Sequence, residues 1–396
     1  MKKLFPYALI VFLFTLSILL FLLIPNDANR SAEESLTAST HQLADALQLA
    51  ARQKINYSQS ITVNAIGDIL VHNPVYESAK TTEGYDFKPM FEPIKKYLEA
   101  ADITIANQES IIGGEEIGLS SYPSFNSPYE VADALKDAGV DIVSMANNHT
   151  LDRGEQAILN ATNYLNQVGI AYVGAYRNEK DRNQPRMITK NGISVGFLSY
   201  TYGTNGIPIP DGKDHLVNYI EQEQILHDLD ELQNQVDFVF VSMHFGSEYE
   251  PLPNDEQIYL TDLLTNNGAD VIIGHHPHVL QPVDWISVNG EHERFANYSL
   301  GNFLSNQKGL DRNIGAISQI TLTKERKNGG FTHSVSNASM MPTYNTSAEY
   351  GFKIVPLIDA AQYGLTDANR VFQNTAQHLK TFTDEIEVIP YLDAVQ

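Results

Sequence analysis

The chain has 396 residues, enough for one large domain or two ordinary ones, and its hydrophobic fraction of 43% is that of a globular protein. Its 48 acidic residues against 26 Lys and Arg give a formal net charge of −22, which argues against nucleic-acid binding; an anionic ligand would need local positive charge from metals or a small basic patch. The absence of cysteine excludes disulfides, thiolate catalysis and Cys-type zinc sites, so any metal must be held by His, Asn and carboxylates.

The N-terminal segment predicts a membrane anchor, residues 1–24. Lys2 and Lys3 precede an apolar, uncharged run over residues 4–24, which as a helix is about 31 Å long, the thickness of a bilayer core. The positive flank predicts a single-pass cell-membrane protein with an extracytoplasmic main domain. The alternative is a cleaved signal peptide, whose apolar region is normally shorter. Residues 25–60 are polar and are expected to form a linker.

From residue 61 onward, short apolar runs alternate with amphipathic segments, which predicts an α/β layered domain over residues 61–306. The predicted strands cover residues 61–66, 103–106, 141–145, 193–199, 238–243 and 271–273. A capping box is expected at Ser127–Glu130, and Asp152 and Asn254 are expected to begin two further helices.

The alternation ends after residue 306. The sequence there predicts a strand over residues 316–322 and a helix over residues 367–381. We expect residues 307–396 to form a C-terminal extension that packs on the main domain.

Five of the predicted strands are followed at once by side chains that bind metals. In chain order these are Asp68 and His72, then Glu109, then Asn148 and His149, then His244, and finally His275, His276 and His278. Ligands bind outside the carboxyl ends of strands in open α/β sheets, so these groups are expected to converge. Carboxylate, imidazole and carboxamide ligands suit Mn, Zn or Fe. Two such ions about 3.5–4 Å apart can activate a water and neutralise developing charge.

Each of these residues also has an ordinary structural interpretation. Asp68, after a glycine, can close a turn, His72 can be an ordinary loop residue, and Asn148 can cap a helix. These separate explanations would require five coincidences at equivalent strand ends, so a shared metal site is favoured. Two long loops, residues 110–127 and 201–214, either line a substrate groove or are surface connections. The candidate substrate-binding residues are Asn147, Tyr122 and Phe125.

Six motifs in a fixed order give the chain a resemblance to a known family. They are Gly67-Asp68-Ile69-Leu70, Asn107-Gln108-Glu109, Ala146-Asn147-Asn148-His149 with Asp152 and Gly154, His244-Phe245-Gly246 with Glu248-Tyr249, Gly274-His275-His276-Pro277-His278-Val279, and Ser299-Leu300-Gly301-Asn302-Phe303. The series resembles that of the poly-γ-glutamate capsule-synthesis proteins of the CapA/PgsA type. That family is similar to the calcineurin-like metallophosphoesterases, which implies a four-layer α/β/β/α sandwich.

The resemblance implies a role for each position. The first metal would be bound by Asp68 with His72 and His278, Glu109 would bridge the two metals, and the second metal would be bound by Asn148, His244 and His276. His149 would protonate a leaving group or steady the transition state. The spacing of Asp68 and His72 differs from the Asp-x-His of the superfamily, and Glu109 stands where the superfamily has a bridging Asp.

The resemblance also implies a function at the cell surface. It predicts a phosphoesterase-like, metal-dependent hydrolase in the synthesis or export of poly-γ-glutamate capsule, with polymer-synthase membrane subunits and an anionic polymer or its precursor as partners. The alternative is a non-catalytic, membrane-anchored accessory subunit of a polymer synthase or exporter. His149 beside Asn148 favours the hydrolase, because a purely structural metal site needs no acid beside it.

Overall fold

The computed structural model describes residues 40, 42–43, 57–288, 290, 292–327 and 329–393. The predicted anchor over residues 4–24 lies outside these residues, as does nearly all of the predicted linker. None of the helices in the described part of the chain is long and apolar enough to cross a bilayer. The chain divides into two compact units, one of residues 1–57 with 325–332 and one of residues 58–324 with 333–396. The second unit contains every site residue discussed below.

Among the described residues, the first sheet has nine strands, in the order β14-β13-β12-β1-β2-β3-β4 with β11 beside β1 and β15 beside β13. Their bounds are β1 (Tyr57–Ile69), β2 (Ile103–Gln108), β3 (Ile142–Ser144), β4 (Ala171–Val173), β11 (Asn302–Leu304), β12 (Ile314–Lys327), β13 (Gly330–Asn345), β14 (Ile354–Pro356) and β15 (Glu387–Val388). Strands β11, β1, β2, β3 and β4 pair in parallel, so their carboxyl ends meet at one edge.

The second sheet of the described chain has six strands in the order β5-β6-β7-β8-β10-β9. Their bounds are β5 (Met187–Lys190), β6 (Ile193–Thr201), β7 (Phe238–His244), β8 (Val271–His275), β9 (Val283–Val288) and β10 (His292–Asn297). Strands β6, β7 and β8 are parallel to one another. Their carboxyl ends therefore also share one edge, and both β7 and β8 end in a histidine.

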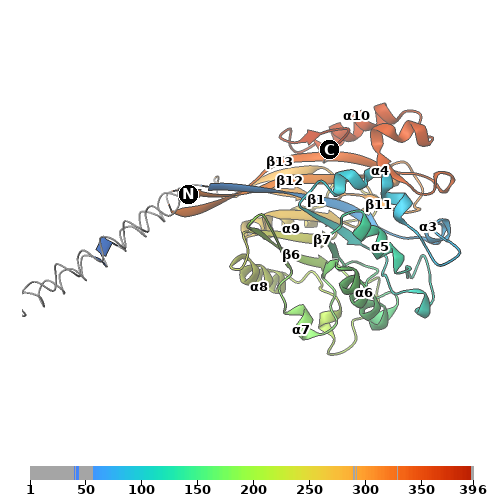
Figure 1. The fold of residues 1–396 in the computed structure, drawn as a ribbon, viewed down its shortest axis with the longest axis horizontal. Coiled ribbons are helices and arrows are strands. Elements are labelled where there is room, and N and C mark those ends of the chain that lie inside the picture. Colours follow the sequence, from blue (N-terminus) through green and yellow to red (C-terminus); the bar gives the residue numbers. More distant parts are fainter. Residues whose placement is uncertain are drawn as a thin grey trace, which may run out of the picture. The chain divides into compact units, whose positions relative to one another are not determined.

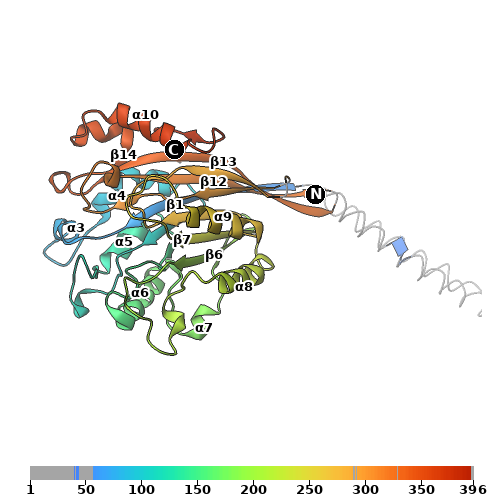
Figure 2. The same cartoon turned by 180° about the vertical axis from the view of Figure 1, so that it is seen from behind.

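Helices cover the outer faces of both sheets, as Figure 1 and the reverse view in Figure 2 show. Against the first sheet pack α4 (Lys88–Leu98), α5 (Glu130–Asp137) and α6 (Gly154–Val168), and against the second pack α8 (Gln222–Gln233) and α9 (Asp255–Asn266). The second unit also contains α3 (Asn73–Ser78), α7 (Glu179–Arg182), α10 (Ala368–Leu379) and the 3-10 turns η1 (Glu115–Ile117), η2 (Asp214–Leu216), η3 (Asp311–Asn313), η4 (Ala348–Tyr350) and η5 (Leu357–Tyr363).

The layers follow from the alternation of apolar side chains along the strands. On β1, Ile61 and Val63 join the apolar cluster between the two sheets, whereas Ile66 joins the cluster beneath α4, α5 and α6. On β7, Phe240 belongs to the cluster between the sheets and Val239 to the cluster beneath α8 and α9. Successive side chains of a strand point to opposite faces, so both sheets are buried on both sides. The result is the α/β/β/α order that the resemblance implies.

The six predicted strands are all present, and so is the helix predicted at Asn254, which caps α9 in a capping box with Gln257. The capping box predicted at Ser127–Glu130 is wrong. Helix α5 begins at Glu130 without a side-chain cap, because the Ser127 hydroxyl donates to the Ser110 hydroxyl instead, at 2.9 Å.

Residues 307–396 contribute four strands to the first sheet, with β12 next to β1. The predicted strand over residues 316–322 lies within β12, and the helix predicted over residues 367–381 is α10. Helix α10 packs through Val371 and Phe372 into the apolar cluster that also contains Met340 of β13. This part of the chain is therefore continuous with the sheet that presents Asp68.

Candidate metal centre

The ends of β1, β2, β7 and β8 bring together the side chains predicted to bind metal. Asp68 lies near the end of β1, where the pairing with β2 shifts register between Ile66 and Asp68 and the pairing with β11 shifts between Asp68 and Ile69. Such irregularities re-aim a side chain out of the regular ladder. Glu109 directly follows β2, and His244 ends β7. All three side chains are buried.

Asp68 is held by three polar neighbours. Its Oδ1 accepts from Asn107 Nδ2 at 2.8 Å and lies 3.0 Å from His275 Nδ1, and its Oδ2 lies 3.1 Å from His278 Nδ1. Burial alone would raise the pKa of Asp68, but the hydrogen bonds and charges of His275 and His278 outweigh it and hold the pKa well below its usual value. Asp68 is therefore an ionised carboxylate, as a metal ligand must be.

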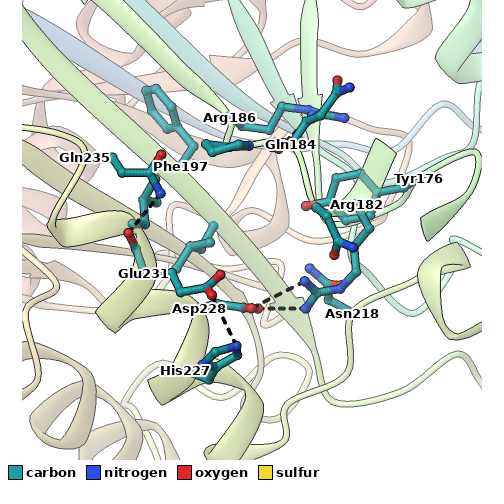
Figure 3. Close-up of a pocket in the computed structure, with 14 residues that line it drawn as sticks. Tyr176, Arg182, Gln184, Arg186, Phe197, Asn218, His227, Asp228, Glu231 and Gln235 are labelled. Carbon is teal, nitrogen blue, oxygen red and sulfur yellow. Dashed lines mark hydrogen bonds and ion pairs between the residues drawn. The ribbon is translucent and has the colours of Figure 1, made fainter. Parts of the chain in front are cut away.

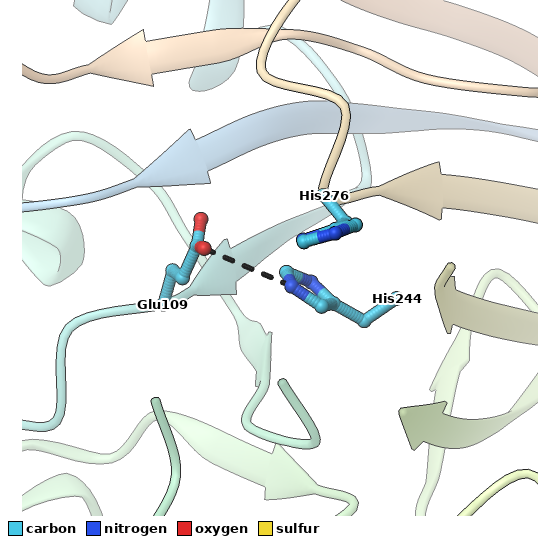
Figure 4. A group of neighbouring side chains, drawn as sticks. All are labelled: Glu109, His244 and His276. Atoms are coloured by element: carbon cyan, nitrogen blue, oxygen red, sulfur yellow. Dashed lines mark ion pairs between the residues drawn. The ribbon is translucent and has the colours of Figure 1, made fainter. Parts of the chain in front are cut away.

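Glu109 is the most unusual side chain of the site. It is 0% exposed, and neither carboxylate oxygen has a hydrogen-bond partner among the described residues. Its Oε1 lies 3.7 Å from His244 Nε2 and 3.6 Å from His278 Nε2, and Figure 4 shows it pointing toward the imidazoles of His244 and His276. Burial raises the pKa of Glu109 well above its usual value. A buried carboxylate without hydrogen-bond partners is costly, so this donor set fits a bound cation.

Two groups of potential ligands share Glu109 within the described chain. One is Asp68, Glu109 and His278, and the other is Glu109, His244 and His276, with the donor atoms of each group within 4.8 Å of one another. A third group is formed by Glu248, His276 and His278. Two ligand sets joined by one carboxylate are the arrangement that a bridged pair of divalent ions requires.

The imidazoles of the site differ in protonation. Burial lowers the pKa of His276 to about 3 and that of His244 well below its usual value, so both rings are neutral and offer a lone pair. Burial also acts to lower the pKa of His278, but the charge of Glu109 and the hydrogen bond to Asp68 raise it to about 9. In the metal-free protein His278 therefore carries a proton that a cation must displace.

The backbone of the site is strained at three residues. His276 and His278 have φ values of 98° and 59°, and Tyr249 has a φ of 67°. Positive φ is costly for residues with a Cβ and is found mostly at Gly and Asn. The Tyr249 N–H donates to the Pro277 carbonyl at 2.7 Å, which joins the two strained segments. Strain of this kind accumulates at functional sites, where the surrounding structure enforces it.

Asn148 and His149 follow β3 and face different partners. Asn148 Oδ1 lies 2.8 Å from His244 Nε2, within reach of the second ligand group. His149 Nδ1 donates to Asp152 Oδ2 at 2.7 Å, and the Asn205 amide lies 3.4 Å from the same nitrogen. Asp152 also accepts from the Phe125 N–H, at 2.6 Å. The predicted role of Asp152 as a helix cap is therefore wrong, because its carboxylate is bound to His149 and to the loop.

His72 and Phe125 lie next to the site and outside the three ligand groups of the described chain. The Asn306 N–H donates to His72 Nδ1 at 3.2 Å. The ring of Phe125 is buried between two imidazoles, 5.2 Å from that of His72 and 4.7 Å from that of His149. Phe125 thus fixes the position of both rings, and the role of His72 as a ligand stays a prediction.

The two other predicted substrate contacts differ in exposure. Asn147 is buried, with its Nδ2 donating to the Gln108 carbonyl at 2.9 Å and its Oδ1 accepting from the His149 N–H at 3.0 Å. Tyr122 is 78% exposed. Asn147 therefore shapes the loop that carries His149, and a substrate role for either residue stays a prediction.

Several residues that complete the site received no specific role from the sequence, although His275 was among the metal-binding side chains predicted at the strand ends. His275 binds Asp68, as described above, and Asn302 Oδ1 lies 3.0 Å from His278 Nδ1. The Tyr202 ring lies 4.7 Å from that of His276, and Glu248 belongs to the third ligand group. His275, Asn302 and Glu248 all lie within the six motifs, so their motif positions were the available signal.

A separate hollow of about 420 Å3 lies beside β6 and α8, and no member of the ligand groups lines it. Its two arginines form ion pairs with carboxylates. Figure 3 shows Arg182 beside Asp228, with Nη2 of the arginine 2.7 Å from Oδ2 of the aspartate. Arg186 is likewise paired with Asp181, at 2.5 Å. These contacts account for the charges of the hollow without a ligand.

Comparisons with known proteins agree with the motifs. The family model described as bacterial capsule synthesis protein PGA_cap matches residues 62–307. The capsule biosynthesis protein CapA of Bacillus anthracis is 28% identical over 282 residues, covering 69% of this chain and 66% of that protein, just under two thirds of its length. The PGA biosynthesis protein CapA of Bacillus subtilis is 28% identical over 279 residues, covering 68% of this chain and 70% of that protein.

Among solved structures, the calcineurin-like phosphoesterase YfkN of Bacillus subtilis aligns with a TM-score of 0.41 and 14% identity, covering 82% of this chain and 100% of that one. The resemblance seen in the six motifs is confirmed by the match to the family model, which covers more than half of the residues. The chain therefore belongs to the bacterial capsule synthesis protein family PGA_cap.

Proposed function

We propose that this protein acts in the synthesis or export of a capsule polymer of the poly-γ-glutamate type, through a site that binds two divalent metal ions and catalyses hydrolysis. The observation that carries the proposal is Glu109, a buried carboxylate without hydrogen-bond partners that two ligand groups share. Family membership and the names of the CapA relatives support the capsule role. The apolar run after Lys2 and Lys3 supports a cell-surface location, with polymer-synthase membrane subunits as partners.

The residues present fit two metals. Asp68, Glu109 and His278 would hold one ion, and Glu109, His244 and His276 would hold the other. Asn148 Oδ1, close to His244 Nε2, is placed to join the second set. Bound divalent ions would supply Lewis acidity and lower the pKa of a water molecule. The mixture of carboxylate, imidazole and carboxamide ligands is compatible with Mn, Zn or Fe.

His149 is the group that we propose for proton transfer. Its Nδ1–H donates to the Asp152 carboxylate at 2.7 Å, which fixes the tautomer and leaves Nε2 to exchange a proton with the substrate. A protonated ring would give the Nε2 proton to a leaving oxygen or nitrogen, and the contact with Asp152 would keep the ring oriented for the transfer. Phe125 and Asn147 hold the imidazole from two sides, through ring packing and through the backbone.

The proposal is tested by metal analysis of the purified full-length protein together with a hydrolysis screen of phosphoester and γ-glutamyl substrates. We expect two ions per chain, loss of both in Glu109→Ala and loss of one in His244→Ala, with Glu92→Ala on the exposed face of α4 as the control. An unchanged metal content in Glu109→Ala would reject the bridging role. A protein that binds metal and is required for polymer export, yet turns over no substrate, would favour the alternative function, a non-catalytic accessory subunit, over the hydrolase.

A further inference from the structure

Arg312 stands out at the rim of the metal centre because its guanidinium has no ionic partner. It lies in η3, just after β11, and is half-buried. Among the described residues the guanidinium makes no salt bridge and no hydrogen bond; it stacks over the Tyr249 ring, 3.7 Å from the ring centroid. The chain has 48 acidic residues and only 26 basic ones, so an unpaired arginine is unexpected. By contrast, Arg182 and Arg186 in the hollow of Figure 3 are both paired with carboxylates.

Two connections tie Arg312 to the ligand His278. The Tyr249 ring that carries the guanidinium lies 6.2 Å from the His278 ring. The Asn302 amide donates to the Arg312 carbonyl at 2.9 Å, and its Oδ1 lies 3.0 Å from His278 Nδ1. The backbone and the side chain of Arg312 are therefore both positioned by residues that touch the metal ligand.

Tyr249 is itself held in a costly conformation. Its φ of 67° is in the left-handed region, which strongly disfavours an aromatic residue. Its N–H donates to the carbonyl of Pro277, between the strained ligands His276 and His278. The ring on which Arg312 rests is thus fixed by the same loop that presents two of the imidazoles.

We propose that Arg312 is a specificity-determining residue that binds an anionic group of the substrate, a carboxylate or a phosphate, and that Tyr249 is its positioning residue. The inference rests on the proposed function of the metal centre. A guanidinium offers a planar fork of donors that matches the two oxygens of either group. Because the chain carries a net charge of −22, an anionic substrate needs such a local cation to approach the site.

The surroundings of Arg312 leave room for the rest of such a substrate. Tyr249 also lines a hollow of about 500 Å3, whose walls include Val279, Leu310 and Ile314. Two carboxylates, Asp311 and Glu248, are close in the chain to Arg312 and Tyr249, and neither forms an ion pair with the guanidinium in the described structure. The guanidinium therefore remains available to an anionic ligand.

The test is equilibrium binding to the purified, metal-loaded full-length protein by isothermal titration at low salt. The probes are a γ-linked glutamate trimer, which carries carboxylates, and glycerol 1-phosphate. We expect Arg312→Ala to weaken binding of at least one probe by about 10- to 100-fold, the loss typical of a hydrogen bond to a charged group. Arg312→Lys should recover part of the affinity, since it keeps the charge without the fork. Lys180→Ala, which removes an exposed charge on α7, is the control and should bind as wild type does.

Two further measurements separate the roles. Tyr249→Phe keeps the ring and should bind normally, whereas Tyr249→Leu should weaken binding as Arg312→Ala does. Metal content is measured on every preparation and should be the same in the Arg312 variants as in wild type. A wild-type protein that binds no metal would count against the proposed function and would leave the role of Arg312 to the binding data. A loss confined to the trimer assigns a carboxylate, and a loss confined to the phosphate assigns a phosphate. Equal affinity of wild type and Arg312→Ala for both probes, or no binding of either probe to wild type, would overturn the inference.

Discussion

Replacing Glu109 by Gln separates the cost of burying this side chain from its use as a metal ligand. The change keeps the shape of the side chain and removes its charge. In the metal-free protein neither Glu109 oxygen has a hydrogen-bond partner within the described structure, so the substitution breaks no hydrogen bond in that state. In the metal-loaded protein the variant lacks the carboxylate that two ligand groups share. We therefore expect the substitution to have opposite effects on stability in the two states.

The magnitudes follow from the pKa and from binding. Burial raises the pKa of Glu109 well above its usual value. A carboxyl with a raised folded-state pKa keeps a proton that the unfolded chain has lost, so the unfolding free energy falls as the pH rises above the unfolded value of about 4.3. Glu109→Gln removes this decline. At pH 8 the unfolding free energy of the metal-free variant should therefore equal or exceed that of metal-free wild type. A metal at 1,000 times its Kd stabilises wild type by about 4 kcal/mol, a gain the variant should largely lack.

The assay is thermal unfolding of the full-length protein between pH 6 and pH 9, first with a chelator and then with increasing Mn or Zn. Glu92→Gln, on the exposed side of α4, controls for the loss of one carboxylate. We expect wild type to gain several degrees in Tm on metal addition and Glu109→Gln to gain little. If metal stabilises the variant as much as wild type, or if the variant is destabilised equally with and without metal, Glu109 is not a bridging ligand.

Three other predictions follow from the same site and from the sequence. The pKa of His278 is raised to about 9 and burial raises that of Glu109, so metal binding must release at least one proton, and metal affinity should rise by at least about tenfold per pH unit between pH 6 and pH 9. Titrations in buffers of different ionisation enthalpy would show no proton release if this is wrong. His149→Ala should lose about 10²–10⁴-fold in turnover while keeping its metals, and Asp152→Asn should also lose turnover; full activity of either variant on a hydrolysed substrate would exclude the proton-transfer role. Protease added to wall-stripped cells should digest the main domain and spare residues 1–24, whereas complete protection would contradict the predicted topology.

The convergence of the ligands could be predicted from the sequence because parallel strands bring their carboxyl ends to one edge. Asp68, Glu109 and His244 each follow an apolar run that is easily recognised as a strand. The distance between them along the chain does not matter once the strands are known to be parallel. The α/β class was predictable because these apolar runs alternate with amphipathic segments along the chain.

Other features depend on where distant segments meet, which local patterns do not encode. Asp152 precedes a helix and so looks like a cap, yet its carboxylate binds His149 and the Phe125 N–H of a long loop. Strand β13 carries Ser, Thr and Asn at many positions and lacks an apolar run, so its strand character comes from pairing with its neighbours in the sheet. The unpaired guanidinium of Arg312 also emerges only from the folded structure, because a sequence does not show which charges find partners.

The place of β12 beside β1 has a consequence for the order of folding. Asp68 and His278 are 210 residues apart in the chain, and Asp68 is also paired in register with Asn302. Contacts of such sequence separation form late and slowly, since the entropy of closing a long loop must be overcome first. Strand β12, residues 314–327, lies directly beside β1 and is followed in the chain by three more strands of the same sheet, β13, β14 and β15. We therefore expect the two ligand groups to assemble late in folding, and metal to bind an almost folded protein without nucleating its folding.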